Sequence, residues 1–252
     1  MADDYERLLS KLRPGRLEKD SENYKIMGEV FDQSTLMALY WMTNHGTFDE
    51  LHGTVSTGKE ANIFYAQNSD GEPVAIKIYR VATSDFQTKW RYLTGDPRFQ
   101  TFRGSQRHIV NTWVKREYKN LQRAKKAGVR APTPIVTRRN VLAMEFLGEE
   151  GHPYPRMKDT PPENPQETFE TLVSSVKKLY QDAKLVHADL SEYNVLLDPD
   201  PIIIDFSMST DIMNPSAEEW LERDIRNLIR YFSKIGAEVP EFDELLKEMK
   251  EG

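Results

Sequence analysis

The sequence predicts an α+β fold in two parts, a largely antiparallel sheet with one helix and then a mainly helical region. Short apolar runs alternate with turn-forming residues between positions 48 and 147, which is typical of antiparallel strands. Longer stretches with apolar residues at helical spacing follow at 165–184 and 217–235, with a shorter one at 241–250. A length of 252 residues allows two lobes around one cleft.

Composition restricts the function classes. The chain has a net charge of −6, which argues against an extensive nucleic-acid-coating role but is compatible with a local basic patch. It has no cysteine, so disulfides and thiolate metal sites are excluded. No apolar run approaches the roughly 18 residues of a membrane span, and the first residues are acidic. We therefore expect a cytoplasmic protein with no membrane partner and no DNA partner.

Residues 1–47 are predicted to form a helical extension that precedes the sheet. Apolar residues recur at helical spacing in two stretches, and Asp32 and Ser34 are candidate caps at the start of the second one. We expect this second helix to pack on the main domain. The alternative is a small nucleic-acid-binding helical unit, although its charge is mixed and no recognition-helix pattern is visible.

The predicted sheet contains one loop suited to binding phosphate. Residues 48–55 and 61–66 read as strands, and the polar loop between them holds Ser56, Thr57, Gly58 and Lys59. A short loop with one glycine can lay backbone N–H groups over phosphates, and the lysine and hydroxyls add donors. Serine–glycine turns are common, so this loop alone does not establish a site. The remaining predicted strands are 73–79, 135–137 and 141–147.

Lys77 strengthens the case for a nucleotide site. It ends the run Val-Ala-Ile-Lys in the third strand, the position from which protein kinases direct a lysine to the α- and β-phosphates. Such a lysine needs an anion to hold it in place. Glu117 is the best candidate, because it lies beside the apolar face of a helix predicted over 110–127. The alternative is that Glu117 is a surface charge.

Residues 81–109 show little periodicity. They combine basic, aromatic and hydroxyl side chains in a connection that is long for a compact domain. This mixture could contact RNA or a protein partner, or form a loop with no partner. Candidate phosphate acceptors in or near the connection are Thr83, Ser84, Thr101 and Ser105.

The strongest chemical signal is the loop at 187–194 with the sequence H-A-D-L-S-E-Y-N. Asp189 lies five residues before Asn194, and two short apolar runs joined by a turn would return Asp205 to a position beside Asn194. Phosphoryl transfer to a hydroxyl needs a carboxylate to orient the nucleophile and oxygen ligands to hold Mg²⁺. Asp189 suits the first role, and Asn194 and Asp205 suit the second. His187 is more plausible as a structural hydrogen-bonding group than as a base.

Six motifs of the chain are informative together: Ser56–Ala61, Val74–Lys77, Trp113–Glu117, Pro153–Asp159, His187–Asn194 and Ile204–Phe206. Taken together, they resemble the RIO family of atypical protein kinases, and the S-T-G-K-E-A loop is similar to that of its first subfamily. The resemblance implies a two-lobed, protein-kinase-like fold with an N-lobe at 48–147 and a reduced C-lobe at 148–252.

The resemblance also implies an activity. It implies ATP- and Mg²⁺-dependent phosphorylation of Ser and Thr, including autophosphorylation, with Mn²⁺ as an alternative metal. It implies an ATPase reaction through an aspartyl phosphate on Asp205, and a partner in the pre-small-ribosomal-subunit particle, made of protein and rRNA. In a kinase-like fold, the strand that contains Met144 and Glu145 joins the lobes, and backbone groups near Glu145 and Leu147 would contact the adenine edge.

The sequence departs from ordinary protein kinases in its nucleotide loop and in the region that follows Asp205. Its nucleotide loop has one glycine instead of three, Ser207 follows Asp205-Phe206, and no A-P-E segment follows. With 47 residues after Asp205, there is no room for an activation loop or peptide-docking helices. Two alternatives remain. A small-molecule phosphotransferase shares the H-x-D-x-x-x-x-N loop and the D-F motif, but such enzymes usually carry a long helical substrate lobe after D-F. A nucleotide-binding scaffold would have no need of Asp189.

Overall fold

The computed structural model describes residues 31–81 and 105–251. Contacts divide the chain into two compact units: described residues 31–81, 105–118 and 134–153 form the first, and 119–133 with 154–251 form the second. The division differs from the predicted one in three respects. The helix before the sheet and residues 148–153 belong to the first unit, and 119–133 belongs to the second. The predicted helix over the first residues, and Thr83, Ser84 and Thr101, lie outside the described residues.

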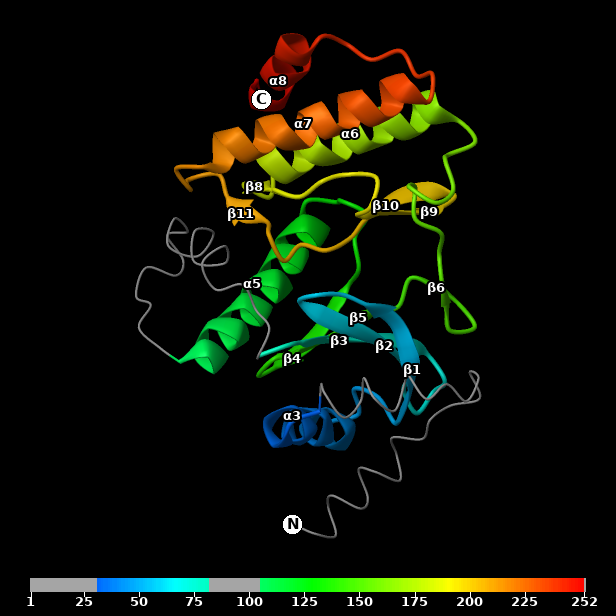
Figure 1. Cartoon of the computed structure of the whole chain (residues 1–252), viewed down its shortest axis with the longest axis vertical. Coiled ribbons are helices and arrows are strands. Elements are labelled where there is room, and N and C mark those ends of the chain that lie inside the picture. Colours follow the sequence, from blue (N-terminus) through cyan, green and yellow to red (C-terminus); the bar gives the residue numbers. More distant parts are fainter. Residues whose placement is uncertain (1–30, 82–104, 252) are drawn as a thin grey trace. The chain divides into compact units, whose positions relative to one another are not determined.

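The first unit is built on a five-stranded antiparallel sheet (Figure 1). Its strand order is β1-β2-β3-β5-β4, so the hairpin β4-β5 adds to β3 and places β3 in the middle. Helix α5 (Gln106–Lys126) leaves this unit after Tyr118. The other elements are α3 (Gln33–Asn44), β1 (Glu50–Thr57), β2 (Ala61–Gln67), β3 (Pro73–Tyr79), β4 (Pro134–Arg138), β5 (Val141–Glu145), β6 (Gly148–Glu149) and β7 (His152–Pro153).

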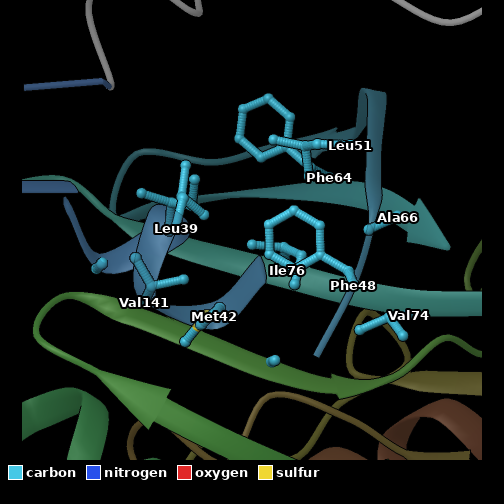
Figure 2. Packing of buried hydrophobic residues seen from close by; sticks show 12 residues of the cluster. Leu39, Met42, Phe48, Leu51, Phe64, Ala66, Val74, Ile76 and Val141 are labelled. Atoms are coloured by element: carbon cyan, nitrogen blue, oxygen red, sulfur yellow. The ribbon is translucent and has the colours of Figure 1, made fainter. Parts of the chain in front are cut away.

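Helix α3 packs its apolar side into the core of this unit. Ala38, Leu39 and Met42 are fully buried in one cluster with residues of the sheet such as Phe64 and Ile76 (Figure 2). The Asp32 side chain caps the helix by accepting a hydrogen bond from the Thr35 N–H at 2.8 Å. The predicted core-packing role of this helix and the Asp32 cap are therefore confirmed.

Several predicted boundaries in the first unit were wrong. Strand β1 extends through Ser56 and Thr57, so the polar loop is a tight hairpin turn that starts at Gly58. Strand β5 ends at Glu145 and leaves Leu147 outside the sheet. Helix α5 starts at Gln106, so residues 106–109 are helical. The polar side chains of residues 106–108 obscured the helical period in this first turn.

The second unit is mainly helical. Helices α6 (Pro165–Gln181) and α7 (Ala217–Lys234) lie side by side and α8 (Phe242–Lys250) packs on both (Figure 1). The three predicted helices are present, although α6 ends before Lys184. The predicted hairpin is present as β9 (Val195–Asp198) and β10 (Asp200–Ile203), but its turn is tighter than predicted and β10 ends before Asp205. The short pair β8 (Leu185–Val186) and β11 (Thr210–Asp211) was not predicted, because two-residue strands show no periodicity.

The helices and strands of this unit hold the loop at 187–194 in place. The Phe169 and Phe232 rings join α6 to α7 at 5.4 Å between centroids. Strand β8 leads directly into His187, and Asn194 leads into β9.

Among the described residues, no helix combines the length and apolar character that a membrane crossing requires.

Candidate functional site

In the first unit, a buried ion pair fixes Lys77. The Lys77 Nζ lies 2.7 Å from the Glu117 Oε1, and both side chains are almost fully buried, with relative exposures of 6% and 1%. Residues 77 and 79 lie on the same side of β3, and the Tyr79 hydroxyl donates to the other Glu117 oxygen. A buried charge is tolerated when it is paired and hydrogen-bonded. The predicted Lys77–Glu117 pair is present.

The turn between β1 and β2 and the strand end before it contain the four residues that were predicted to bind phosphate. Thr57, Gly58 and Lys59 are exposed, whereas Ser56 is partly buried in the strand ladder opposite Ile63. The Gly58 N–H donates to the Ala61 oxygen at 2.9 Å, so this N–H closes the turn. Phosphate contacts from this turn would come from Lys59 and the Thr57 hydroxyl rather than from the Gly58 amide.

Strand β5 positions the residues predicted near adenine. Met144 is 8% exposed and pairs with Ala75, and Glu145 pairs with Val74 at the end of the strand. Leu147 belongs to neither β5 nor β6, so its backbone lies outside both strand ladders. Residues 146–147 therefore form a short connection between β5 and β6.

In the second unit, the three acidic and amide residues predicted to do chemistry are close together. The Asn194 Nδ2 donates to the Asp189 Oδ2 at 3.0 Å and to the Asp189 carbonyl oxygen at 2.8 Å. The Ile204 N–H donates to the Asn194 carbonyl oxygen at 3.0 Å, which places Asp205 next to Asn194 across the base of the hairpin. The predicted return of Asp205 to Asn194 is therefore confirmed.

Two backbone conformations shape this cluster. Ala188, before Asp189, has φ 66°, and Asp205 has φ 61°, both in the left-handed region that non-glycine residues seldom occupy. The Ser207 N–H donates to the Asp205 Oδ1 at 3.3 Å. Strained residues of this kind persist where surrounding contacts hold them, and they concentrate at functional sites.

His187 lies under the loop. Its side chain is buried, its Nε2 is 3.1 Å from the Ile204 carbonyl oxygen, and its ring meets the Phe206 ring edge-on at 4.9 Å. The histidine therefore connects the two segments that contain Asp189 and Asp205. This is the structural hydrogen-bonding role expected from the sequence.

Asp224 on α7 also supports the loop, and the sequence reading missed it. Its two carboxylate oxygens accept hydrogen bonds from the N–H groups of Ala188 and Leu190, at 2.7 and 2.9 Å, on either side of Asp189. Asn227, one turn later, donates to the Leu190 carbonyl oxygen at 3.0 Å. Complete burial raises the pKa of Asp224 to about 7, even though the two backbone N–H groups favour the charged form.

A signal for Asp224 was present in the sequence. It lies between Leu221 and Leu228 at the spacing of the buried face of α7, where an aspartate is out of place unless it has partners. Asn120 was missed in the same way. It is fully buried, and its Nδ2 donates to the carbonyl oxygens of Phe206 and Ser209 at 3.2 and 2.8 Å, which fixes the segment after Asp205.

The donor set near Asp205 suits Mg²⁺. Magnesium prefers oxygen ligands and usually binds one or two protein groups together with substrate phosphates and water. Both hydrogen bonds from the Asn194 amide use Nδ2, so Oδ1 is the amide atom with the capacity to bind a cation. Within the described residues, no group of three or more His, Asp or Glu side chains could form an all-protein metal cage. Asn194 and Asp205 would hold the metal, which would supply charge neutralisation at the phosphates.

Comparison with known proteins identifies the family. A model of the RIO domain matches residues 62–245. The chain is 42% identical over 221 residues to the RIO-type serine/threonine-protein kinase Rio1 of Haloferax volcanii, covering 87% of this chain and 76% of that protein. It is 34% identical over 253 residues to human serine/threonine-protein kinase RIO1, covering 95% of this chain and 44% of the human protein.

A solved structure shows the same fold. The Rio2 kinase of Chaetomium thermophilum, described as an ADP/Mg²⁺-phosphoaspartate complex, matches with a TM-score of 0.67 and 18% identity. The match covers 100% of this chain and 88% of that one. The α+β fold with an antiparallel sheet and a helical region is thus the RIO kinase fold, and the chain belongs to the RIO-domain family of serine/threonine protein kinases.

Proposed function

We propose that this protein uses Mg²⁺-ATP to phosphorylate serine or threonine, itself included, and that it also hydrolyses ATP through an aspartyl phosphate on Asp205. The observation that carries the proposal is the cluster of Asp189, Asn194 and Asp205. Asp189 is exposed and hydrogen-bonded, so it can orient an acceptor hydroxyl and accept its proton. A nucleotide-binding scaffold has no need of such a base.

Each of the other predicted residues has a separate role in this proposal. Lys77, held by Glu117, would contact the α- and β-phosphates. Thr57 and Lys59 would contact the phosphates from the hairpin turn, with Ser56 and Gly58 shaping that turn. Backbone groups near Glu145 and Leu147 would contact adenine, beside the Met144 side chain. Positioning and charge stabilisation supply most of the rate enhancement in phosphoryl transfer.

The ATPase reaction would proceed in two steps. An Asp205 carboxylate oxygen attacks the γ-phosphorus, the bond to the β,γ-bridging oxygen breaks, and ADP leaves. Water then attacks the acyl phosphate and releases inorganic phosphate and the carboxylate. Carboxylates form such intermediates in other ATPases, and the phosphoaspartate of the Chaetomium thermophilum Rio2 complex supports the same chemistry in this chain.

We also propose a role in the cytoplasm, in maturation of the small ribosomal subunit. Membership of the RIO family supports this part of the proposal. In that role, ATP binding and hydrolysis would drive a switch of state on the particle.

The fate of the γ-phosphate tests the proposal. The purified protein would be incubated with Mg²⁺ and γ-labelled ATP, alone and with small-subunit precursor particles. Label that resists hydroxylamine would establish a hydroxyl acceptor, and hydroxylamine-labile label lost in Asp205→Asn would establish the aspartyl phosphate. If ATP binds but neither protein label nor free phosphate forms, the kinase proposal fails and the scaffold alternative holds.

A further inference from the structure

Positive charge is concentrated in one continuous segment of this acidic chain. Residues 105–144 contain ten lysines and arginines and a single acidic residue, so the segment carries +9. Because the whole chain carries −6, the other 212 residues carry −15. The one acidic residue, Glu117, is buried against Lys77 and contributes nothing to the surface.

In the second unit, this charge is exposed over residues 119–130. Lys119, Lys125 and Lys126 on α5 and Arg130 after it are exposed. Residues 119 and 126 lie seven apart, which places them on one face of the helix. Leu121, Ala124 and Val129 of the same stretch are buried.

Two arginines of the 119–130 segment contact other segments of the second unit. Arg123 donates to the carbonyl oxygens of Ala183 and Lys184 and pairs with Asp211 at 2.9 Å. Arg130 pairs with Asp198 at 3.0 Å. The lysines are therefore presented on a well-anchored helix end, so binding a ligand there would order little additional chain.

We propose that Lys119, Lys125 and Lys126, here called the basic face, bind the phosphate backbone of RNA. The proposal adds a second binding site to the kinase and names the chemistry of its partner. Where the proposed ribosomal role is correct, the RNA is rRNA; the basic face itself requires only a phosphodiester backbone.

The composition of the basic face favours RNA over a protein partner. Cores of protein–protein interfaces are enriched in apolar and aromatic residues and depleted in lysine. Interfaces with nucleic acids are polar and strongly positive. The basic face is rich in lysine, and the large exposed apolar residues described in the second unit, Tyr193 and Met213, lie outside the 119–130 segment.

Helix stability alone does not account for the charges. Cations in the last turn of a helix interact favourably with its dipole, each contributing about 0.3–1 kcal/mol. This explains Lys125 and Lys126 at the end of α5, but Lys119 lies two turns before the end. A test must therefore separate removal of charge at a helix end from removal of the basic face.

The second unit supplies a matched control. The test variant is Lys119→Gln, Lys125→Gln and Lys126→Gln combined. The control is Lys178→Gln, Lys234→Gln and Lys247→Gln combined, which removes the same charge from exposed lysines at the last turns of α6, α7 and α8. Binding of a fluorescein-labelled RNA hairpin of about 30 nucleotides would be measured by anisotropy over a series of KCl concentrations.

We expect the test variant to bind at least tenfold more weakly than wild type near 0.1 M salt. The slope of log Kd against the logarithm of the salt concentration should be smaller than that of wild type by about 2, because each phosphate contact contributes roughly 0.7–0.9 to that slope. The control should match wild type. Three results would overturn the proposal. They are an equal loss of RNA affinity in the test and control variants, no RNA binding by wild type at low salt, and competition with the RNA by polyglutamate or phosphatidylserine vesicles that equals competition by unlabelled RNA.

ATP turnover without RNA separates this inference from the proposed function. No residue of the basic face belongs to the proposed phosphotransfer machinery, so both combined variants should turn over ATP as wild type does. If wild type itself shows no turnover, the proposed enzymatic function fails while the RNA result is unaffected.

Discussion

The contact of Asp224 with the loop at 187–194 gives a prediction that can be worked out in some detail. Asp224→Asn keeps the size of the side chain but leaves one oxygen for the two N–H groups of Ala188 and Leu190. The new NH₂ group faces one of those donors. Hydrogen bonds to charged groups contribute about 1.5–3 kcal/mol, and a buried donor without a partner costs about 1–3 kcal/mol. The peptide groups on both sides of Asp189 therefore lose their fixed orientation.

The pH dependence has a defined sign. The Asp224 pKa rises from 3.8 to about 7 on folding, so the folded protein holds this proton more tightly than the unfolded chain. The resulting stabilisation is complete below pH 3.8 and is lost as the pH rises to about 7. Three pKa units correspond to about 4 kcal/mol, as an upper bound. The asparagine variant lacks this term.

Urea unfolding at pH 5 and pH 8, together with steady-state phosphotransfer, would measure both effects. We expect wild type to lose stability between the two pH values, and the variant to lose less. At pH 8, kcat should fall by about 10- to 100-fold with nucleotide affinity within a few-fold, because Asp224 acts through the loop. Unchanged kcat together with an unchanged pH dependence would show that Asp224 does not position the loop.

Three further substitutions test other parts of the structure. Glu117→Gln should lower kcat/KM at least tenfold and reduce stability by about 3 kcal/mol, since it leaves the Lys77 ammonium buried without its counter-charge; unchanged thermal unfolding would contradict this. Asp189→Asn should reduce phosphotransfer at least 100-fold with ATP affinity within a few-fold by calorimetry, and near-normal transfer would remove Asp189 from its role. Gly148→Ala should lower Tm by several degrees, because a Cβ at position 148 would overlap the His152 carbonyl oxygen; an unchanged Tm would show that the β6-β7 hairpin adapts.

Local patterns were sufficient to predict the central elements. Strand β3 and the hairpin β9-β10 were predicted because each has a short apolar run bounded by turn residues. The contact between Lys77 and Glu117 was predictable because a buried ammonium needs an anion and Glu117 lies beside an apolar helix face. The need for a negative charge restricts the possible partners of the buried Lys77 ammonium to acidic residues.

Other features depend on contacts between distant segments. Strands β8 and β11 are each two residues long and pair across the chain, so neither has a local signature. Asp224 and Asn120 act on backbone groups of loops far away in sequence. A polar residue at an apolar helix position shows that a partner is needed, but the sequence does not identify the partner.

Calorimetric titration of ATP with and without Mg²⁺ tests the central claim most directly. The comparison is among wild type, Asp205→Ala and Asp189→Ala. If Asp205 holds the metal and Asp189 acts on the acceptor, Mg²⁺ should strengthen ATP binding in wild type and Asp189→Ala but have little effect in Asp205→Ala. An undiminished effect of Mg²⁺ on ATP binding in Asp205→Ala would contradict the assignment of the metal to Asp205.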